Sequence, residues 1–519
     1  MIFNLQFTMY DLRFYFTKKK ILTLYSLFFI HCSFGQIEKG DKLYNDYKYA
    51  QAAEIYKVDA DKGNIRAIRK IAECYRKIND YENAEKYYAF VVADKNPVPK
   101  SFLYYGQMLM NNEKYDTAKI WLEKYYALKN ADSVFTKVLI ASCEKGKSNN
   151  EIQRKITFRN LEKLNSKTSD FCAVPFEKGI LFTSTREGKI NGTSGMGYQQ
   201  VYFAKINKDS VYEVELIKGV VNTKKMNSGP ACVDTLHDII YFTKNNFQYG
   251  DAITNKKGDV TLKIFSAEKN HEGWNDIKLL ELNDIEYSCA FPSISKQGTV
   301  LYFASDRGGG FGGKDIYFSV KTNGVWSKPK NCGKSINTSG DERYPFIHAD
   351  GTLYFSSNGY AGFGGMDIYK SVPNKIGEFG KPENLGKPFN SSTDDFGFYL
   401  DGNYNIGYFS SDRVGGKGMD DIYEFEYTNI PIEISFYSNG NPIDSVQVSL
   451  EKNGKIMLDS IFSKKFTENL DPNSNYTIKA SKDGFIISDL KIKTTQNKKP
   501  ITKSINLTPI LKEEEKDEK

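Results

Sequence analysis

The sequence holds 519 residues, of which 14% are aromatic and 26% charged, and its formal net charge is +7. A chain of this length exceeds one hydrophobic core, so we expect two to four domains. The small excess of positive charge points to no polyanionic partner such as a nucleic acid.

Residues 1–35 have the pattern of an export signal. Lys18 to Lys20 form a basic start, an apolar core runs over residues 21–30, and Ser33-Phe34-Gly35 is a small-x-small cleavage site. Ten apolar positions are too few for a membrane-spanning helix, which needs about 20 residues. We therefore expect a periplasmic protein with no transmembrane segment. Lipid anchoring at Cys32 is the less favoured alternative, because His31 stands where a lipobox has a small residue.

A helical repeat is predicted over residues 36–150. Three sets of small and apolar residues recur with equal internal offsets: Gly40, Leu43, Tyr49, Ala52 and Tyr56; Ala72, Tyr75, Tyr81, Ala84 and Tyr88; Gly106, Leu109, Tyr115, Ala118 and Leu122. This pattern resembles the tetratricopeptide (TPR) repeat, a helix-turn-helix unit of about 34 residues. The small first members would let paired helices approach closely, and residues 134–143 are expected to cap the solenoid.

The TPR resemblance implies a protein-binding groove along the first helices. The matching positions are mostly basic in the second repeat: Arg66, Arg69, Glu73, Arg76 and Lys77. In the third repeat they are Lys100, Leu103, Gln107, Met110 and Asn111. The implied partner presents an acidic segment. The alternative is a charged helix face that is merely solvated.

A second repeat, predicted to be rich in β-strands, occupies residues 153–428. Its strong copies carry Tyr302, Tyr354 and Tyr408, at intervals of 52 and 54 residues, and weaker copies surround Pro175 and Pro230. Each copy reads as a small antiparallel sheet of about four strands, and several such sheets arranged radially form a propeller. The final strand of a copy is expected at Trp274, Trp326 and Phe379.

The propeller is expected to close on itself. The fifth copy ends near Tyr427 without its last strand, whereas the strand-like run from Ile156 to Leu161 has no sheet of its own. We expect this run to complete the fifth sheet, since closure removes exposed edges. Five blades are favoured, and six would need a further copy that the sequence does not show.

Two more resemblances concern the β-rich part. Leu353-Tyr354-Phe355-Ser356-Ser357, followed by Gly364 to Tyr369, resembles the PD40 motif of TolB-like periplasmic propellers. Residues 429–510 resemble the carboxypeptidase regulatory-like domain, a Greek-key β-sandwich, in Val446 to Leu450 and Tyr476 to Ala480. The charged residues 511–519 are expected to be a disordered tail.

No catalytic, cofactor-binding or metal site is predicted. His237, His271 and His348 are expected on the surface or in loops. The glycines from Gly308 to Gly313 are expected to serve hairpin geometry rather than a nucleotide. Cys172 and Cys289 are expected to be small buried residues.

The repeated polar residues of the propeller are given structural roles. Asp315, Asp367 and Asp421 should accept backbone N–H bonds rather than bind calcium, which needs six or more oxygens. Ser305-Asp306-Arg307 and Ser411-Asp412-Arg413 are expected to be turn and pairing elements.

The order of these parts resembles the PorE-type proteins of type IX secretion and gliding. The resemblance implies a non-catalytic scaffold or adaptor of an envelope complex. The family's C-terminal OmpA-like domain has no counterpart here, so peptidoglycan binding is not expected. The first alternative is a TolB-like propeller that binds a partner peptide in its central channel, and the second is a glycan-binding or lyase-type propeller enzyme.

Overall fold

The computed structural model describes residues 36–148, 155–186, 196–207, 210–223, 226–248, 251–374 and 377–510. The predicted export signal with Cys32 and the predicted tail lie outside these residues. Two compact units are formed: the first holds the helices to residue 148 with short segments from 185–198 and 361–365, and the second holds the remaining chain. Helices followed by antiparallel sheets are the expected multidomain layout.

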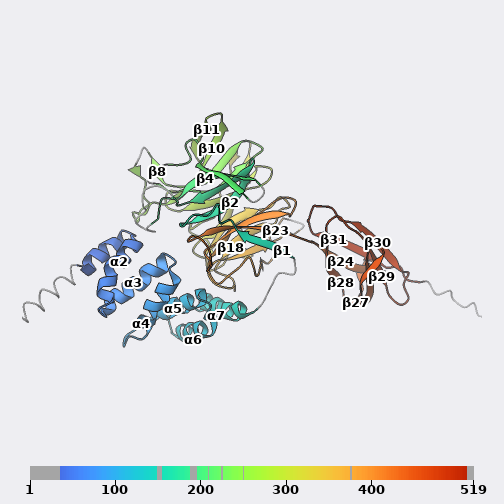
Figure 1. The fold of residues 1–519 in the computed structure, drawn as a ribbon, viewed down its shortest axis with the longest axis horizontal. Helices are drawn as coiled ribbons and strands as arrows, with labels where there is room; N and C mark the ends of the chain where they lie inside the picture. The colour runs from blue at the N-terminus through green and yellow to red at the C-terminus, as the bar shows by residue number, and fades with distance from the viewer. Residues whose placement is uncertain are drawn as a thin grey trace, which may run out of the picture. The chain divides into compact units, whose positions relative to one another are not determined.

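The helical unit begins with a helix over residues 36–45. Six further helices follow (Figure 1): α2 (Tyr49–Ala60), α3 (Ile65–Lys77), α4 (Tyr81–Val92), α5 (Pro99–Asn111), α6 (Tyr115–Tyr126) and α7 (Ser133–Lys147). Each of α2 to α6 packs against the helix that follows it. The side chains of Asn64 and Asp132 accept backbone N–H bonds at the starts of α3 and α7, which satisfies donors that a helix leaves unpaired.

Two glycines set the spacing of helix pairs. A β-carbon on Gly40 would lie 2.6 Å from the ring of Tyr56, and one on Gly106 would lie 2.7 Å from the side chain of Leu122. Tyr56 and Leu122 are fully buried. The prediction that small residues allow close approach is therefore confirmed at these two positions.

The β-rich unit contains five antiparallel sheets between residues 156 and 427 (Figure 1). The first holds β2 (Asp170–Phe176), β3 (Gly179–Ser184), β4 (Gln200–Asn207) and β5 (Ser210–Leu216). The second holds β6 (Ser228–Asp234), β7 (Ile239–Asn245), β10 (Leu262–Asn270) and β11 (Gly273–Leu279). The third holds β12 (Cys289–Ile294), β13 (Val300–Ser305), β14 (Asp315–Thr322), β15 (Val325–Trp326) and β16 (Lys330–Asn331).

The fourth sheet holds β17 (Glu342–Ile347), β18 (Leu353–Ser357), β19 (Asp367–Ser371) and β20 (Glu383–Asn384). The fifth holds β21 (Asp395–Leu400), β22 (Ile406–Ser411), β23 (Asp421–Tyr427) and β1 (Ile156–Asn160). Between β7 and β10 in the sequence, β8 (Phe247–Gln248) pairs with β9 (Asp251–Ala252) in a small two-stranded sheet.

The first strands of the five sheets contact one another in cyclic order. β2 packs on β6, β6 on β12, β12 on β17, β17 on β21, and β21 returns to β2. We call β2, β6, β12, β17 and β21 the inner strands. Sheets that meet around an axis in this way form a β-propeller.

Closure of the propeller is as predicted, but one strand marker is wrong. β1 pairs antiparallel with β23, from Ile156 opposite Tyr427 to Asn160 opposite Tyr423. Phe379, however, lies in an isolated bridge with Pro373, and the outer strand of that sheet is β20. The ring of Phe379 packs edge-on against Tyr302, 6.1 Å between centroids, so its apolar character serves packing rather than strand pairing.

Two further sheets follow the propeller in the chain (Figure 1). One holds β24 (Ile430–Ser438), β25 (Asn441–Pro442), β28 (Lys465–Leu470) and β31 (Ile501–Asn506), the last parallel to β24. The other holds β26 (Val446–Lys452), β27 (Lys455–Phe462), β29 (Asn475–Ser481) and β30 (Ser488–Lys493). Both contribute to one apolar core that includes Phe436, Val448 and Ile478. Two sheets that share a core agree with the predicted sandwich.

Candidate functional site

The predicted basic strip lies on α3 and α5, and two of its arginines are held in ion pairs. Arg66 pairs with Asp41, and Arg69 pairs with Asp94. Arg69 also donates to the carbonyl oxygen of Asn96 at 2.9 Å. These two positive charges therefore help to hold helices and loops together.

The other strip residues differ in how far their charges are engaged. Glu73 accepts a hydrogen bond from the Tyr44 hydroxyl at 2.7 Å. The guanidinium of Arg76 lies 3.9 Å from the ring centre of Tyr104. Lys77 and Lys100 are exposed and Gln107 is half-buried. The other positions predicted to line the groove in the third repeat are buried and so face the core instead: Leu103, Met110 and Asn111. Partial burial disfavours the charged form of Lys77 and, with the positive charge of the neighbouring Arg76, lowers its pKa.

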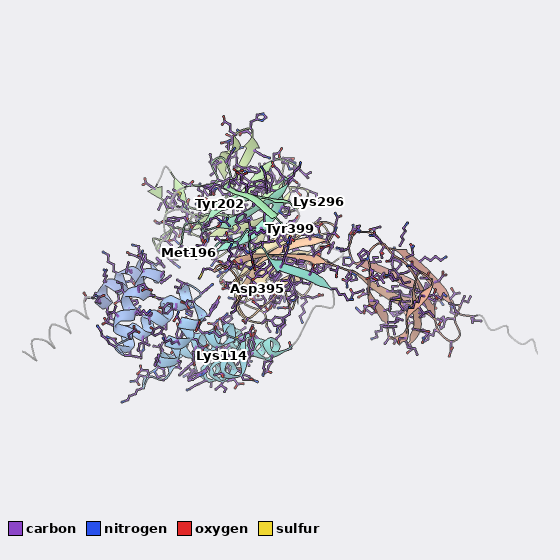
Figure 2. The ribbon with its side chains drawn as sticks, in the orientation of Figure 1. Lys114, Met196, Tyr202, Lys296, Asp395 and Tyr399 are labelled. Carbon is purple, nitrogen blue, oxygen red and sulfur yellow. The ribbon has the colours of Figure 1, made fainter. Side chains whose placement is uncertain are left out.

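A cavity of about 230 Å³ lies where the five inner strands meet. All five inner strands contribute lining residues, most of them apolar or aromatic, including Val174, Pro230, Phe291, Phe346, Phe398 and Tyr399. Tyr399 is labelled among the side chains of the propeller in Figure 2. Its volume is below the roughly 300–1,000 Å³ of pockets that enclose drug-sized ligands. It suits a single side chain or a small apolar group.

Each inner strand carries a β-bulge beside this cavity. At each bulge one residue adopts a left-handed backbone, with φ of 54° at Cys172, 101° at Gly229, 59° at Phe291, 52° at Tyr344 and 62° at Gly397. For residues other than glycine this conformation costs roughly 1–3 kcal/mol each. Bulges turn side chains to new directions. Cys172, Phe291, Tyr344 and Gly397 all line the cavity.

Burial sets the protonation of the polar groups around the cavity. It raises the pKa of the Cys172 thiol and of the Tyr344 hydroxyl well above their ordinary values. Both groups are therefore neutral at neutral pH, and Cys172 is a poor nucleophile. Asp420 is not one of the lining residues, and burial together with the negative charges of Asp394, Asp421 and Asp170 raises its pKa to about 6.

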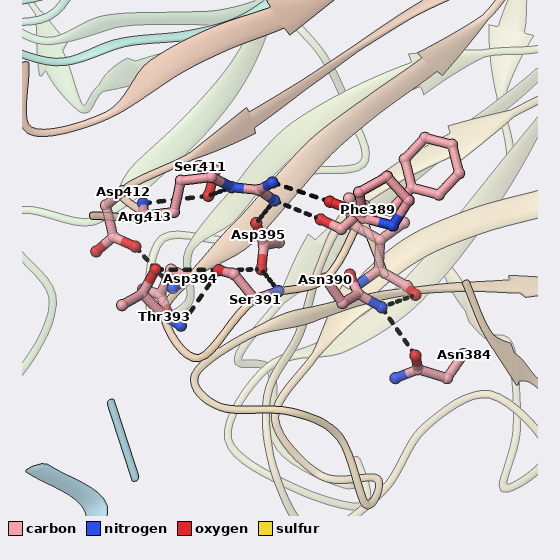
Figure 3. A network of polar contacts seen from close by, with 12 residues as sticks. Asn384, Phe389, Asn390, Ser391, Thr393, Asp394, Asp395, Ser411, Asp412 and Arg413 are labelled. Atoms are coloured by element: carbon pink, nitrogen blue, oxygen red, sulfur yellow. Dashed lines mark hydrogen bonds and ion pairs between the residues drawn. The ribbon is translucent and has the colours of Figure 1, made fainter. Parts of the chain in front are cut away.

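The Ser-Asp-Arg motif of the fifth sheet forms a buried network (Figure 3). Arg413 pairs with Asp395 at 2.6 Å and donates to the carbonyl oxygens of Pro388 and Phe389 at 2.9 and 2.8 Å. Asp412 accepts the backbone N–H of Asp394 at 2.7 Å. The motif thus ties the loop before β21 to the end of β22, as expected for a pairing element.

Asp315 and Asp421 of the repeated aspartates have the predicted structural role. Asp315 accepts backbone N–H bonds from Phe311 and Gly312 at 2.7 and 3.1 Å, and Asp421 accepts one from Gly418 at 3.0 Å. Each repeated aspartate also accepts a 2.7 Å bond from an asparagine side chain: Asn331 to Asp315, Asn384 to Asp367 and Asn160 to Asp421. The glycine-rich loop is shaped around the Asp315 carboxylate.

A set of five asparagines escaped the sequence analysis. Each one follows the outermost strand of a sheet and bonds both the N–H and the C=O of one residue in the third strand, at 2.7–3.0 Å: Asn222 to Val201, Asn283 to Ile264, Asn337 to Ile316, Asn390 to Ile368 and Asn165 to Ile422. We call these five residues the clamp asparagines. The five share a short sequence signal: an apolar residue precedes each asparagine, and Ser, Thr or Asp follows it.

His348 lies in the turn that follows β17, which agrees with the predicted loop position, but its side chain is buried rather than on the surface. Nδ1 lies 2.7 Å from Asp350 Oδ1, and Nε2 lies 3.1 Å from the carbonyl oxygen of Asp401. Asp350 also accepts a hydrogen bond from the Tyr404 hydroxyl. His348 therefore joins the turn of the fourth sheet to the turn of the fifth. Cys172 and Cys289 are buried as predicted.

Within the part of the chain that the structure describes, no three His, Cys, Asp or Glu side chains are grouped to hold a metal ion. None of the described helices combines the length and the apolar character needed to cross a membrane.

Comparisons with known proteins give only distant structural likenesses. No known protein family and no curated protein matches the sequence. Among solved structures, the chain is similar to Kuenenia stuttgartiensis hydrazine synthase, with 9% identity and a TM-score of 0.32, over 64% of this chain and 62% of that one. It is also similar to an exo-β-1,3-galactanase from Clostridium thermocellum, with 13% identity and a TM-score of 0.32, over 63% of this chain and 82% of that one. Likenesses at these scores carry no argument about what this chain does.

Proposed function

We propose that this chain is a non-catalytic periplasmic scaffold or adaptor that holds protein partners of an envelope complex. The proposal assigns TPR-like repeats to residues 36–150, a five-bladed propeller to 153–428 and a Greek-key sandwich to 429–510. We extend it to type IX secretion and gliding because the predicted order of parts resembles that machinery's PorE-type proteins.

The cavity at the inner strands is the observation that carries this proposal. It is lined mainly by apolar and aromatic side chains. Polar groups at the ends of two inner strands, which do not line the cavity, are engaged in the fold: Asp395 at the start of β21 with Arg413, and His348 after β17 with Asp350. A cavity with a mainly apolar lining is suited to holding a group rather than transforming it.

Cross-linked affinity purification from the cell envelope tests the role of the cavity. Val233→Phe would fill the cavity, because Val233 lines it, whereas Val325→Phe makes the same change at a residue of β15 that is 61% exposed. We expect a defined envelope polypeptide with the intact chain and with Val325→Phe, and at least fivefold less with Val233→Phe. Equal recovery with all three chains would contradict the proposal.

The same purification tests the helical strip. Lys77→Glu with Lys100→Glu reverses two exposed charges without touching the ion pairs of Arg66 and Arg69. Lys57→Glu with Lys129→Glu is the charge-matched control, since both lysines are exposed outside the strip. Loss of a partner with the first pair and not with the second would support an acidic ligand for the groove. Equal recovery would favour a merely solvated strip.

The second candidate is a TolB-like propeller that captures a partner's peptide during envelope maintenance, and the same cavity favours it. The identity of the recovered partner separates the two. Components of a secretion complex support the first candidate, and a peptidoglycan-associated lipoprotein supports the second. A glycan recovered with the intact chain and lost with Val233→Phe, without any polypeptide, would favour the glycan-binding alternative.

A further inference from the structure

One sheet edge of the sandwich has exposed side chains that are mostly apolar. Among the described strands β27 pairs with β26 alone, so β27 is an edge of the sheet whose order is β27-β26-β29-β30. Ile456, Met457 and Ile461 of β27 are 57%, 58% and 68% exposed. Such an edge presents backbone N–H and C=O groups that a further strand can pair.

The opposite edge of the same sheet shows how such an edge is guarded. Charged side chains on an edge strand discourage pairing with another chain. The exposed residues of β30 are all charged: Asp489, Lys491 and Lys493. β27 has eight residues, of which only Lys455 and Asp459 are charged. The edge at β27 is therefore open to an added strand, whereas the edge at β30 is guarded.

The core of the sandwich is also open along β27. Leu458 and Phe462 are half-buried and pack against this core from its margin. β27 is regularly paired with β26 from Leu458 to Phe462, and a β-bulge at Met457 ends that run. A strand added beside the run would cover the parts of Leu458 and Phe462 that are still exposed. The added strand therefore needs apolar residues opposite these two.

A second copy of β27 fits this edge poorly. In a symmetric antiparallel pair, the two-fold axis places one residue of the strand opposite the same residue of its copy. With Asp459 at that centre, two carboxylates would meet. With Leu458 at the centre, Asp459 would lie opposite Met457. With Ser460 at the centre, it would lie opposite Ile461. Each register sets the charge of Asp459 against a like charge or an apolar side chain, which is unfavourable.

A basic residue fits opposite Asp459. Asp459 is exposed and accepts a hydrogen bond from the side-chain amide of Gln447, which leaves its negative charge without a compensating cation. We propose that β27 binds an extended segment of a partner polypeptide as an added antiparallel strand, with Lys or Arg opposite Asp459 and apolar residues opposite Leu458 and Phe462. Backbone hydrogen bonds hold such a strand, and alternate side chains select it. The surface is separate from the cavity, so this inference goes beyond the proposed function.

Fluorescence anisotropy with dye-labelled peptides tests the pairing on the full-length protein. The probe is Thr-Val-Ile-Thr-Lys-Val-Thr, whose lysine lies opposite Asp459 when its valines lie opposite Phe462 and Leu458. The matched peptide has Glu in place of Lys. Asp459→Lys reverses the charge on β27, and Asp489→Lys makes the same change at an exposed residue of β30.

We expect the unaltered protein and Asp489→Lys to bind the lysine peptide about tenfold more tightly than the glutamate peptide, and Asp459→Lys to show the reverse preference. The same preference in all three proteins would overturn the placement of a basic residue opposite Asp459. If neither peptide binds, the proposal is wrong. Recovery of a partner with the cavity variants is a separate measurement, so the scaffold proposal would stand or fall independently.

Two N-methylated forms of the lysine peptide test pairing through the backbone. One is methylated at its first, third and fifth residues and the other at its second, fourth and sixth. The N–H groups of alternate residues in a strand point to the same side, so only one form loses the groups that face β27. We expect one form to lose binding and the other to bind like the unmodified peptide. Equal binding of both forms would overturn strand addition.

Sedimentation velocity of the unaltered protein decides whether a second copy occupies the edge. The proposal predicts that β27 does not pair with its own copy. A dimer that Ile461→Lys disperses and Ile487→Lys does not would overturn the proposal, because Ile487 is a 67% exposed isoleucine outside β27.

Discussion

Arg413 shows how a single residue of the repeated motif stabilises the propeller. Its guanidinium bonds the Asp395 carboxylate, which is fully buried, and two backbone carbonyl oxygens. Removal of one member of such a buried pair leaves the other charge without compensation, at a cost of about 3–5 kcal/mol.

We expect Arg413→Ala to lower the free energy of unfolding by about that amount in urea denaturation. Arg159→Ala is the control, because Arg159 pairs with Glu424 while 41% exposed, and such surface pairs contribute about 0–1 kcal/mol. Similar losses for the two variants would contradict the assigned role of Arg413.

Glu342 occupies the position of Asp395 in the fourth sheet but lacks an arginine partner. Gly359 stands where the fifth sheet has Arg413, and a β-carbon at Gly359 would collide with Thr338. The Glu342 carboxyl is fully buried and bonds Thr338 and Ser357. Burial raises its pKa to about 7.

This raised pKa gives a pH dependence of stability with a defined sign. The folded protein holds the Glu342 proton more tightly than the unfolded chain does, so its contribution is complete below the ordinary pKa of glutamate and is lost as pH rises to about 7. The loss is on the order of 3 kcal/mol. We expect Glu342→Gln to flatten thermal stability between pH 5 and 8 relative to the unaltered protein. Parallel pH profiles would show that Glu342 does not titrate in this range.

At the scale of elements, the clamp asparagines replace backbone pairing beside the third strand of each sheet. Asn390 bonds the N–H and C=O of Ile368 and donates to Asn384 at 2.9 Å. Each buried backbone group left unpaired costs about 1–3 kcal/mol.

We therefore expect Asn390→Ala to lower the free energy of unfolding by about 2–4 kcal/mol, measured in urea. Asn497→Ala, at an exposed turn, should change it by less than about 0.5 kcal/mol. A small effect at Asn390 would mean that water replaces the clamp.

Sequence reasoning found the elements whose signal is apolar and periodic. The apolar runs that contain Tyr302, Tyr354 and Tyr408 form β13, β18 and β22 in the structure, and the isolated run that begins at Ile156 forms β1. The clamp asparagines recur at intervals of 57, 61, 54 and 53 residues, each between an apolar residue and Ser, Thr or Asp, but a signal of three residues at uneven intervals is too short to stand out in the sequence alone. The second sheet's repeat is hard to recognise in the sequence because Lys263 takes the place that Asp315 has in the third sheet. The Lys263 ammonium donates to the carbonyl oxygens of Asp284 and Tyr287.

The residues that line the cavity could not be predicted from the sequence. Its lining depends on bulges that turn Cys172, Phe291 and Tyr344 into left-handed backbone, and nothing in their residue types favours that conformation. The burial of His348 was not predicted for a similar reason, because its partner Asp401 lies 53 residues away in the chain. Contacts between sheets arise from assembly rather than from local sequence.

At the scale of the whole molecule, the pairing of β1 with β23 joins the two ends of the propeller's chain. Without it, β23 would be an open edge. We expect Thr157→Pro with Phe158→Pro to break this ladder, because proline donates no backbone hydrogen bond. Differential scanning calorimetry should show a lower melting temperature, and light scattering should show association through the exposed edge. An unchanged melting temperature would contradict closure by β1.

The central claim is that the propeller's cavity holds a polypeptide. Photo-cross-linking in the native envelope tests it most directly, with a benzoylphenylalanine placed at Tyr399, which lines the cavity, or at Phe158, which is 44% exposed on β1. The account predicts that Tyr399 cross-links to one defined envelope polypeptide, that Phe158 does not, and that Val233→Phe abolishes the product. Cross-links from Phe158 alone, or no polypeptide from Tyr399 while the protein is folded and exported, would contradict the claim.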